Sequence, residues 1–302
     1  MIFNKDVALD GILDALFTPY KKSVPDVNHI VTAMLNQGII NKEEDILNDH
    51  IAFRTLGVPN LGIASFEKIF LHHGYKKMEP YFFEQKKLDA FWYAPPSPEY
   101  PRIFISELRV KDLSKATQAI IHNYTDAITK DPIDSIDLDD VKAVGDFFYK
   151  PLWELPTLED YNALAKESEY AAWVIYNRYY LNHYTISVHA LPTPYNNLNT
   201  FNTFLENNGI VLNDSGSKIK ISADGLLKQS SSVAKMILAT FADGTTKEIS
   251  GSYVEFAERL PLPQFAHLPA EELTTAMRRE GFEAANADKI FESTYSEQTS
   301  KS

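Results

Sequence analysis

Apolar positions along this chain recur at two spacings, and each spacing predicts a different kind of element. In two N-terminal stretches, Val7–Phe17 and Pro25–Leu35, the apolar residues lie three or four positions apart. This is the period of an amphipathic helix, so we predict a helix in each. The second follows Ser23 and is closed by Gly38, a residue typical of helix ends.

From His50 onward the pattern changes to short runs rich in branched and aromatic residues. A helical stretch ended by Gly74 interrupts these runs, and turn signals such as PPSPEYP separate them. The predicted order is strand His50–Leu56, helix Ser65–His72, and strands Lys77–Glu84, Leu88–Tyr93 and Arg102–Val110. A mostly helical region follows, with helices predicted at Leu113–Tyr124 and Leu158–Asn177 and an acidic connector at Asp131–Asp140.

The first pattern then returns. The second copy is predicted as strand Tyr180–Leu191, helix Asn197–Asn207 ended by Gly209, and strands Lys218–Ser222, Ser232–Thr240 and Thr246–Glu258. A polar residue followed by histidine opens both copies, and each histidine lies a similar distance before its helix-ending glycine: 74 − 50 = 24 and 209 − 183 = 26 residues. We therefore predict an internal duplication.

The elements together predict a single functional domain of the α+β class over residues 1–302, built on two βαβββ modules. Its parts are N-terminal helices (1–40), a first module (45–110), a helical insertion (111–178), a second module (179–262) and a C-terminal helical tail (263–302). In the tail we predict a helix at Glu271–Glu280 after Pro269, and a loose end over the last ten residues.

The composition narrows the chemistry. The chain has no cysteine, which excludes thiolate zinc sites, iron–sulfur clusters and a cysteine nucleophile, so any metal ligands must be His, Asp or Glu. A net charge of −12 argues against a nucleic-acid partner. No apolar run reaches 18 residues, so we expect no membrane span. The expected location is cytoplasmic, and no obligate protein partner is indicated.

Two of the eight histidines stand out because they open equivalent strands of the two modules. If His50 and His183 lie on strands that pair across a pseudo-twofold axis, their side chains come close together. His189 is excluded as a partner of His183, because six residues of strand separate them by about 20 Å. Ligands of one ion lie within roughly 4 Å of each other.

The best third ligand is Glu255, a carboxylate within the apolar run YVEFA. An acid there is costly to bury unless it is paired. The alternative is that Glu255 faces solvent on an edge strand. Glu258 and Arg259, just beyond, are expected to satisfy each other at the surface. Two histidines and one carboxylate form the ligand set of non-haem iron(II) oxygenases, but they also accept zinc, manganese or cobalt.

Arg54 follows His50 by four residues on the same strand face, about 13 Å along the strand. A buried arginine requires an anion. Either an internal carboxylate or the far end of a short dicarboxylate ligand would provide it. The run Gln229-Ser230-Ser231-Ser232 offers an amide and hydroxyls to a ligand, although such a run is more often a turn.

At these residues the sequence resembles the 2-oxoadipate dioxygenase/decarboxylase family, whose members are also called hydroxyglutarate synthases and are related to the vicinal oxygen chelate superfamily. The resemblance is carried by HIAFRT around His50, by NHYT around His183 and by SYVEFAER around Glu255. It implies a curved mixed sheet around a metal site. It also implies His50, His183 and Glu255 as iron ligands, and Arg54 as the residue that holds the substrate.

The resemblance further implies that Phe282–Phe291 closes the pocket and brings Ala285 and Asn286 to the substrate. The family has a branched apolar residue followed by serine there, so Ala-Asn departs from its pattern. The implied reaction converts a 2-oxo dicarboxylate and dioxygen into a 2-hydroxy dicarboxylate and carbon dioxide, with Fe(2+) as cofactor. Zinc, manganese or nickel are alternatives in a purified sample. Two other functions stay open: a metal-dependent lyase or isomerase, and a non-catalytic protein that binds a small carboxylate.

Overall fold

The structure, a computed structural model, describes residues 7–301. Residues 1–6 of the predicted N-terminal region and residue 302 of the predicted tail lie outside this range. The helices are α1 (Val7–Ser23), α2 (Pro25–Asn36), α3 (Ile63–His72), α4 (Lys115–Thr125), α5 (Val141–Tyr149), α6 (Leu158–Glu167), α7 (Glu169–Asn177), α8 (Leu198–Asn207), α9 (Ala284–Phe291) and α10 (Ser296–Thr299). The strands are β1 (Asn48–Leu56), β2 (Lys76–Phe83), β3 (Leu88–Ala94), β4 (Arg102–Leu108), β5 (His183–Ser187), β6 (Lys220–Ile221), β7 (Leu227–Ser231), β8 (Met236–Thr240), β9 (Thr246–Ser250) and β10 (Tyr253–Arg259).

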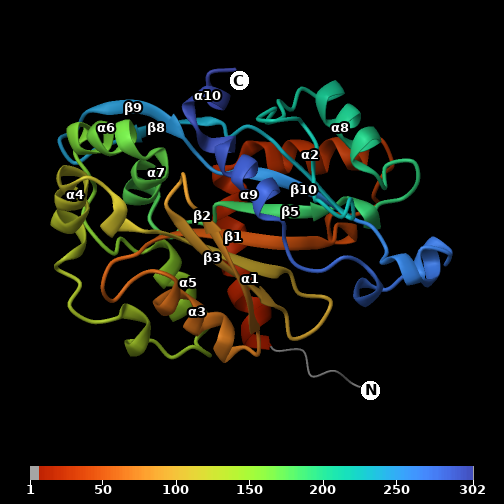
Figure 1. Cartoon of the computed structure of the whole chain (residues 1–302), viewed down its shortest axis with the longest axis horizontal. Coiled ribbons are helices and arrows are strands. Elements are labelled where there is room, and N and C mark those ends of the chain that lie inside the picture. Colours follow the sequence, from red (N-terminus) through yellow and green to blue (C-terminus); the bar gives the residue numbers. More distant parts are fainter. Residues whose placement is uncertain (1–6, 302) are drawn as a thin grey trace.

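A mixed sheet of eight strands, in the order β2-β3-β4-β1-β5-β10-β7-β6, forms the centre of the molecule (Figure 1). Its two middle strands, β1 and β5, are the opening strands of the two modules and pair antiparallel. Each runs parallel to the last strand of its own module, β1 with β4 and β5 with β10. This symmetric order confirms the predicted duplicated fold.

Helices fill the space around the sheet through apolar and small residues. On α3, Phe66 is fully buried and its ring lies 4.6 Å from that of Phe53 on β1. Helices α1 and α5 approach closely because each has a glycine at the crossing. An added Cβ at Gly11 would lie 2.8 Å from Val141, and one at Gly145 would lie 2.9 Å from Ala15. Eight of the nine residues of β1 are buried.

The second module differs from its predicted strands. The structure has a strand that was not predicted, β7, and it contains residues 229–231 of the polar run that we expected to be a turn. The predicted strand Ser232–Thr240 is shortened to β8, which pairs with β9 in a separate two-stranded hairpin. The predicted strand Thr246–Glu258 divides into β9 and β10 around Gly251. The prediction failed here because Gln and Ser side chains are buried in β7, where their hydrogen bonds replace the apolar contacts of an ordinary strand.

The helical insertion and the tail also differ in detail. The predicted helix Leu158–Asn177 divides at Ser168, whose hydroxyl accepts from the amide of Ala171 and starts α7. Glu271–Glu280 forms only short 3-10 turns, because it has no apolar face to bury, and the helix of the tail is α9. Residues 293–299, predicted to be loose, are packed against the rest of the protein, with Gln298 only 1% exposed. Within residues 7–301, none of the helices has the length and apolar character that crossing a membrane requires.

Candidate metal centre

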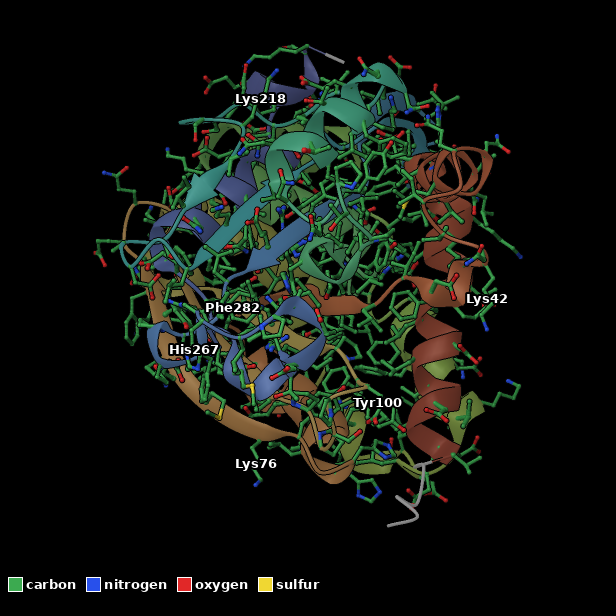
Figure 2. All side chains as sticks on the ribbon, turned by 90° about the vertical axis from the view of Figure 1, so that its right-hand side faces the viewer. Lys42, Lys76, Tyr100, Lys218, His267 and Phe282 are labelled. Atoms are coloured by element: carbon green, nitrogen blue, oxygen red, sulfur yellow. The ribbon has the colours of Figure 1, made fainter. Side chains whose placement is uncertain are left out.

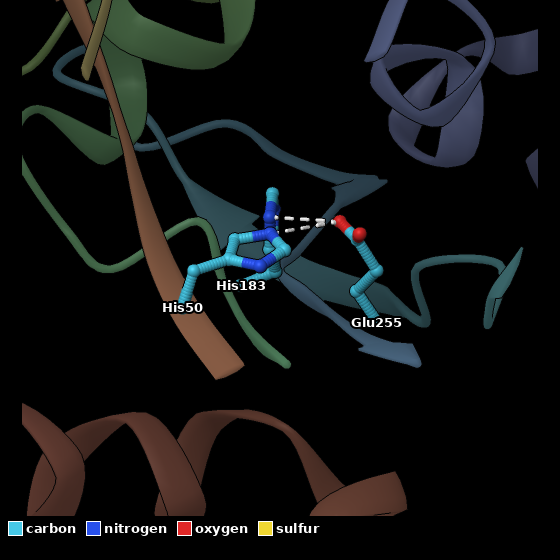
Figure 3. A group of neighbouring side chains, drawn as sticks. All are labelled: His50, His183 and Glu255. Atoms are coloured by element: carbon cyan, nitrogen blue, oxygen red, sulfur yellow. Dashed lines mark ion pairs between the residues drawn. The ribbon is translucent and has the colours of Figure 1, made fainter. Parts of the chain in front are cut away.

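Three strands at the middle of the sheet bring two imidazoles and one carboxylate together. His50 lies in β1, His183 opens β5 and Glu255 lies in β10. Glu255 Oε2 is 3.0 Å from His183 Nε2 and 3.5 Å from His50 Nε2 (Figure 3). One donor atom from each residue lies within 4.8 Å of the other two, and all three residues are buried. The sheet therefore gathers the ligand set expected from the sequence around one point.

The residue before each histidine fixes the orientation of its ring. Asp49 Oδ1 lies 2.8 Å from His50 Nδ1, and Asn182 Oδ1 lies 3.1 Å from His183 Nδ1. An oxygen acceptor at Nδ1 favours the proton there, which leaves the Nε2 lone pair for a metal ion. The polar residue that precedes histidine in both modules, noticed in the sequence only as a repeat, thus supports the ligand that follows it.

The carboxylate of Glu255 is held by a chain of two amides. Gln229 Nε2 donates to Glu255 Oε1 at 2.7 Å, and Asn286 Nδ2 donates to Gln229 Oε1 at 3.0 Å. These bonds engage Oε1 and direct Oε2 at the two histidines. The structure therefore places Gln229 and Asn286 behind Glu255, from β7 and α9.

The charges of the cluster stabilise one another. Burial raises the pKa of Glu255, but His50 and His183 outweigh this effect and hold the pKa well below its usual range. Burial lowers the pKa of His50, and the nearby Glu255 and Asp49 more than reverse the shift. Burial also lowers the pKa of His183, and there it prevails. An anionic carboxylate beside two buried nitrogen donors suits a divalent cation, so the donor set fits a metal ion.

A second group in the described residues has metal-ligand chemistry but a different setting. His72, His73 and Asp139 lie together at the end of α3, where His72 and Asp139 are exposed. His73 is buried, and its Nε2 lies 2.9 Å from the carbonyl of Leu138. Its ring is thus already engaged, and the buried cluster at Glu255 is the better candidate.

A narrow cavity adjoins the buried cluster. One side is formed by the three donors with Gln229 and Tyr253, and the other is apolar, formed by Phe104, Phe282, Ala287, Ile290 and Phe291. Its volume is about 20 Å³, little more than one water molecule requires. Phe282, labelled in Figure 2, is buried and contacts His50 edge to face at 4.8 Å between ring centroids. The apolar wall thus shields the donors from bulk water.

Arg54 is buried beside this cavity without a carboxylate. Its Nη1 donates to Thr294 Oγ1 at 2.9 Å, and its Nη2 donates to the carbonyl of Phe291 at 3.0 Å. The rings of Tyr170 and Trp173 lie 5.2 and 5.1 Å from its Cζ. Its Nε has no hydrogen-bond partner among the described residues 7–301. Among residues 7–301, no ion pair to Arg54 forms, so the internal salt bridge considered from the sequence is absent.

The other residues singled out in the sequence lie elsewhere. Ser231 is buried and its hydroxyl is 2.8 Å from that of Ser293, so it supports the tail rather than lining the cavity. Ala285 is exposed and is not among the residues that line the cavity, so its expected approach to the substrate stays a prediction. The first turn of α9 directs Ala285 away from the sheet, and residues 287, 290 and 291 face the donors instead. His189 follows β5 in a 3-10 turn, away from the metal cluster.

The expected surface pair between Glu258 and Arg259 does not form. Both side chains are buried, Glu258 pairs with Lys228 at 2.9 Å, and Arg259 pairs with Asp49 at 2.7 Å. Consecutive residues of a strand point to opposite faces, so neighbours in β10 cannot pair with each other. Sequence reasoning also missed Tyr253, which lines the cavity. Tyr253 lies two residues before Glu255, and residues two apart in a strand point to the same face, so its place beside Glu255 could have been predicted.

Comparisons with known proteins agree with this geometry. A family model described as 2-oxoadipate dioxygenase/decarboxylase matches residues 12–271. A protein of Arabidopsis thaliana named "2-oxoadipate dioxygenase/decarboxylase, chloroplastic" is 46% identical over 270 residues, which cover 86% of this chain and 71% of the relative. The crystal structure of a hydroxyglutarate synthase from Oryza sativa, in complex with 2-oxoadipate, superposes with a TM-score of 0.90 at 41% identity, covering 98% of this chain and 94% of the other.

A more distant structure bears on the fold alone. A glyoxalase-superfamily protein from Ralstonia eutropha superposes with a TM-score of 0.68 at 22% identity, covering 90% of this chain and 85% of the other. This likeness agrees with the vicinal-oxygen-chelate type of sheet expected from the sequence.

One expectation is contradicted by these comparisons. We expected a cytoplasmic location, whereas the Arabidopsis relative is named as chloroplastic. The error arose because composition and hydropathy report only the absence of a membrane span, and they carry no information on the compartment. The family match and the level of identity are decisive on descent: this chain belongs to the 2-oxoadipate dioxygenase/decarboxylase family, a family of enzymes.

Proposed function

We propose that this protein oxidises and decarboxylates 2-oxoadipate, with His50, His183 and Glu255 holding Fe(2+). The reaction consumes one dioxygen and yields 2-hydroxyglutarate and carbon dioxide. Its atoms balance, because one oxygen atom enters the new carboxylate and the other becomes the 2-hydroxyl group. The observation that carries the proposal is the buried cluster of two imidazoles and one carboxylate, with donor atoms within 4.8 Å, in a chain of this family.

The donor set is more typical of a catalytic iron site than of a structural metal site in which protein ligands fill every coordination position. Two neutral imidazoles and one carboxylate leave a divalent ion with residual positive charge and open coordination positions. Bound iron would supply the redox chemistry that activates dioxygen. The protein contributes rigidity: Asp49 and Asn182 orient the two rings, and Gln229 engages the far oxygen of Glu255.

Arg54 is the proposed contact for the far carboxylate of the substrate. It is 1% exposed, and its present hydrogen-bond acceptors, Thr294 and the carbonyl of Phe291, are neutral. A buried guanidinium with neutral acceptors alone is costly, and a carboxylate would supply the missing anion through charge-assisted hydrogen bonds. Arg54 would thereby set both the length and the orientation of the dicarboxylate.

The remaining residues predicted to bind substrate have more specific roles in this proposal. Gln229 lines the cavity and bonds Glu255, so it positions that carboxylate and faces the substrate. Asn286 acts one step further back, through Gln229. Ser231 acts through its contact with Ser293 in the tail. The apolar wall formed by Phe104, Phe282 and the residues of α9 excludes water from the reacting groups.

The test is direct. The protein is loaded with Fe(2+) without oxygen, mixed with 2-oxoadipate, and exposed to a measured amount of dioxygen. We expect oxygen uptake, carbon dioxide release and 2-hydroxyglutarate formation in a 1:1:1 ratio, and none of these with His183→Ala. A wild-type protein that binds iron but releases no more carbon dioxide than His183→Ala would refute the proposal. Carbon dioxide release without oxygen uptake would show a different, non-oxidative reaction.

A further inference from the structure

Asp49 connects the candidate ligand His50 to a buried arginine. Asp49 Oδ1 accepts from His50 Nδ1 at 2.8 Å and from Arg259 Nη2 at 2.9 Å, and Asp49 Oδ2 accepts from Arg259 Nε at 2.7 Å. The side chains of Asp49 and Arg259 are each 1% exposed. The position of the Asp49 carboxylate, and with it the His50 ring, therefore depends on Arg259.

The same arginine also holds the chain segment that closes the cavity. Arg259 Nη1, the third nitrogen of its guanidinium, donates to the carbonyl of Gly281 at 2.7 Å and to that of Arg279 at 3.0 Å. The next residue, Phe282, has its ring 5.5 Å from the Arg259 guanidinium and 4.8 Å from the His50 ring. Residues 279–282 are thus fixed to Arg259 by two hydrogen bonds and to His50 by a ring contact.

A second arginine repeats this connection. Arg102 Nη1 donates to the backbone carbonyl of Asp49 at 3.2 Å and lies 3.6 Å from Asp49 Oδ2. Its Nε donates to Glu280 Oε2 at 2.8 Å, and its Nη2 donates to Glu280 Oε1. Two buried guanidinium groups therefore link the Asp49 carboxylate, which lies at His50 Nδ1, to consecutive residues of the C-terminal segment.

We infer that Arg259 is a positioning residue that couples metal binding at His50 to the docking of the C-terminal segment, residues 279–291. The inference rests on the proposed function only in requiring that His50 binds a metal ion. When the segment is docked, Arg259 is held at all three nitrogens and fixes Asp49 against His50 Nδ1. When the segment is undocked, Arg259 loses two acceptors and the ring loses its contact with Phe282. Because coupling between two events is reciprocal, the metal must stabilise the docked segment as much as docking stabilises the metal.

This coupling has a role in the family reaction. The segment that Arg259 holds continues into α9, whose residues Ala287, Ile290 and Phe291 form the apolar wall of the cavity. The protein would thus hold its metal most tightly when that wall is in place. An undocked segment would leave the metal more weakly bound and more exposed to water.

The experiment measures zinc affinity and backbone hydrogen exchange on the whole chain, with Zn(2+) as a redox-inert probe. In wild type we expect Zn(2+) to slow exchange in residues 279–291. Arg259→Lys keeps one positive charge but loses the paired hydrogen bonds from Nε and Nη2 to the Asp49 carboxylate. In this variant we expect Zn(2+) affinity to fall about 10- to 100-fold, as for other residues that support metal ligands. We also expect Zn(2+) no longer to slow exchange in that segment.

The matched control is Arg178→Lys. Arg178 is also a buried arginine, and within residues 7–301 its guanidinium donates to the carbonyl of Trp153 through Nε and Nη2. This variant is expected to bind Zn(2+) like wild type and to keep the protection of the segment. If Arg259→Lys does not fold, Asp49→Asn replaces it, because the amide can still accept from His50 but loses the charge that holds Arg259.

The outcomes separate the two proposals. A wild-type protein that binds no divalent metal refutes the metal centre itself. A wild-type protein that binds Zn(2+) without protection of residues 279–291 overturns the coupling alone. Unchanged affinity and unchanged protection in the folded Arg259→Lys or Asp49→Asn protein would show that Arg259 is merely structural.

Discussion

The sharpest prediction concerns Arg54 and the length of the substrate. Replacing Arg54 with methionine keeps much of the side-chain volume and removes the guanidinium. Breaking a buried charge pair costs about 2–5 kcal/mol. At 1.36 kcal/mol for each tenfold change in rate, kcat/KM for 2-oxoadipate is expected to fall about 30- to 5,000-fold. The control substrate is 2-oxohexanoate, which has the same chain length but no far carboxylate. Its kcat/KM is expected to change less than about tenfold, because only an uncharged contact is lost.

The structure also indicates a limited cost in stability. Arg54→Met loses the hydrogen bonds to Thr294 and the Phe291 carbonyl, at about 1 kcal/mol each. It also removes a buried charge that has no carboxylate in the described chain, which offsets part of that cost. Arg178→Met is the matched control, since it removes a buried guanidinium bonded to the Trp153 carbonyl. It is expected to leave the ratio of the two kcat/KM values unchanged.

The assay is oxygen uptake by iron-loaded protein, with iron content measured on the same samples. An equal loss on both substrates would show that Arg54 does not contact the far carboxylate. A loss of iron from Arg54→Met would show that its effect passes through the metal centre. Either result would refute the role proposed for Arg54.

Two further predictions concern stability. Hydrogen bonds to Glu167, first from the Thr117 hydroxyl and then from Ser114 and Lys87, lower its pKa to about 2, from an ordinary value of 4.5. Because the folded pKa is the lower one, Glu167 stabilises the fold above pH 4.5 and this contribution is lost as the pH falls towards 2. Glu167→Gln is expected to lower the free energy of unfolding, measured with urea at pH 7, by about 1 kcal/mol after allowance for partial exposure. The difference between wild type and variant should shrink from pH 7 to pH 3, and a constant difference would contradict this linkage. Gly62→Ala is expected to destabilise by about 2–3 kcal/mol, since φ is +82° and an added Cβ would collide with Glu107 Oε2. Gly244→Ala, with φ +77° and open space, is its control at about 1 kcal/mol, and equal losses would show that the close contact is unimportant.

The centre of the fold was predictable because it depends on local signals that the duplication repeats. The runs around His50 and His183 are both strand-like, and two equivalent strands on a pseudo-twofold axis pair with each other. The structure shows this pairing, with Ala52 opposite His183. The separation of the two histidines then follows from strand geometry, and their ring centroids lie 5.5 Å apart.

The surroundings of the site were less predictable, because they depend on contacts between distant parts of the chain. The partner of Arg259 is Asp49, 210 residues away, and neither residue has a local signal for that pairing. Strand β7 was taken for a turn because Gln229 and its serines are polar. Their burial makes sense only beside Glu255, Asn202 and Ser293, which bond them. Polar residues near a site follow the chemistry of the site rather than the periodicity of the strand.

The size of the cavity adds a constraint on how the substrate enters. A cavity of about 20 Å³ cannot hold a six-carbon dicarboxylate, so part of its wall has to move. Arg54 donates to the carbonyl of Phe291, the last residue of α9, and to Thr294 in the turn that follows, so the guanidinium proposed to bind the substrate also anchors the wall. A substrate carboxylate makes stronger hydrogen bonds to the guanidinium than the neutral carbonyl and hydroxyl do. Under the proposed function, the far carboxylate therefore displaces these contacts as it binds, and part of its binding energy is used to move α9. A shorter 2-oxo acid that cannot reach Arg54 leaves α9 in place, so the arginine selects the substrate by access as well as by affinity.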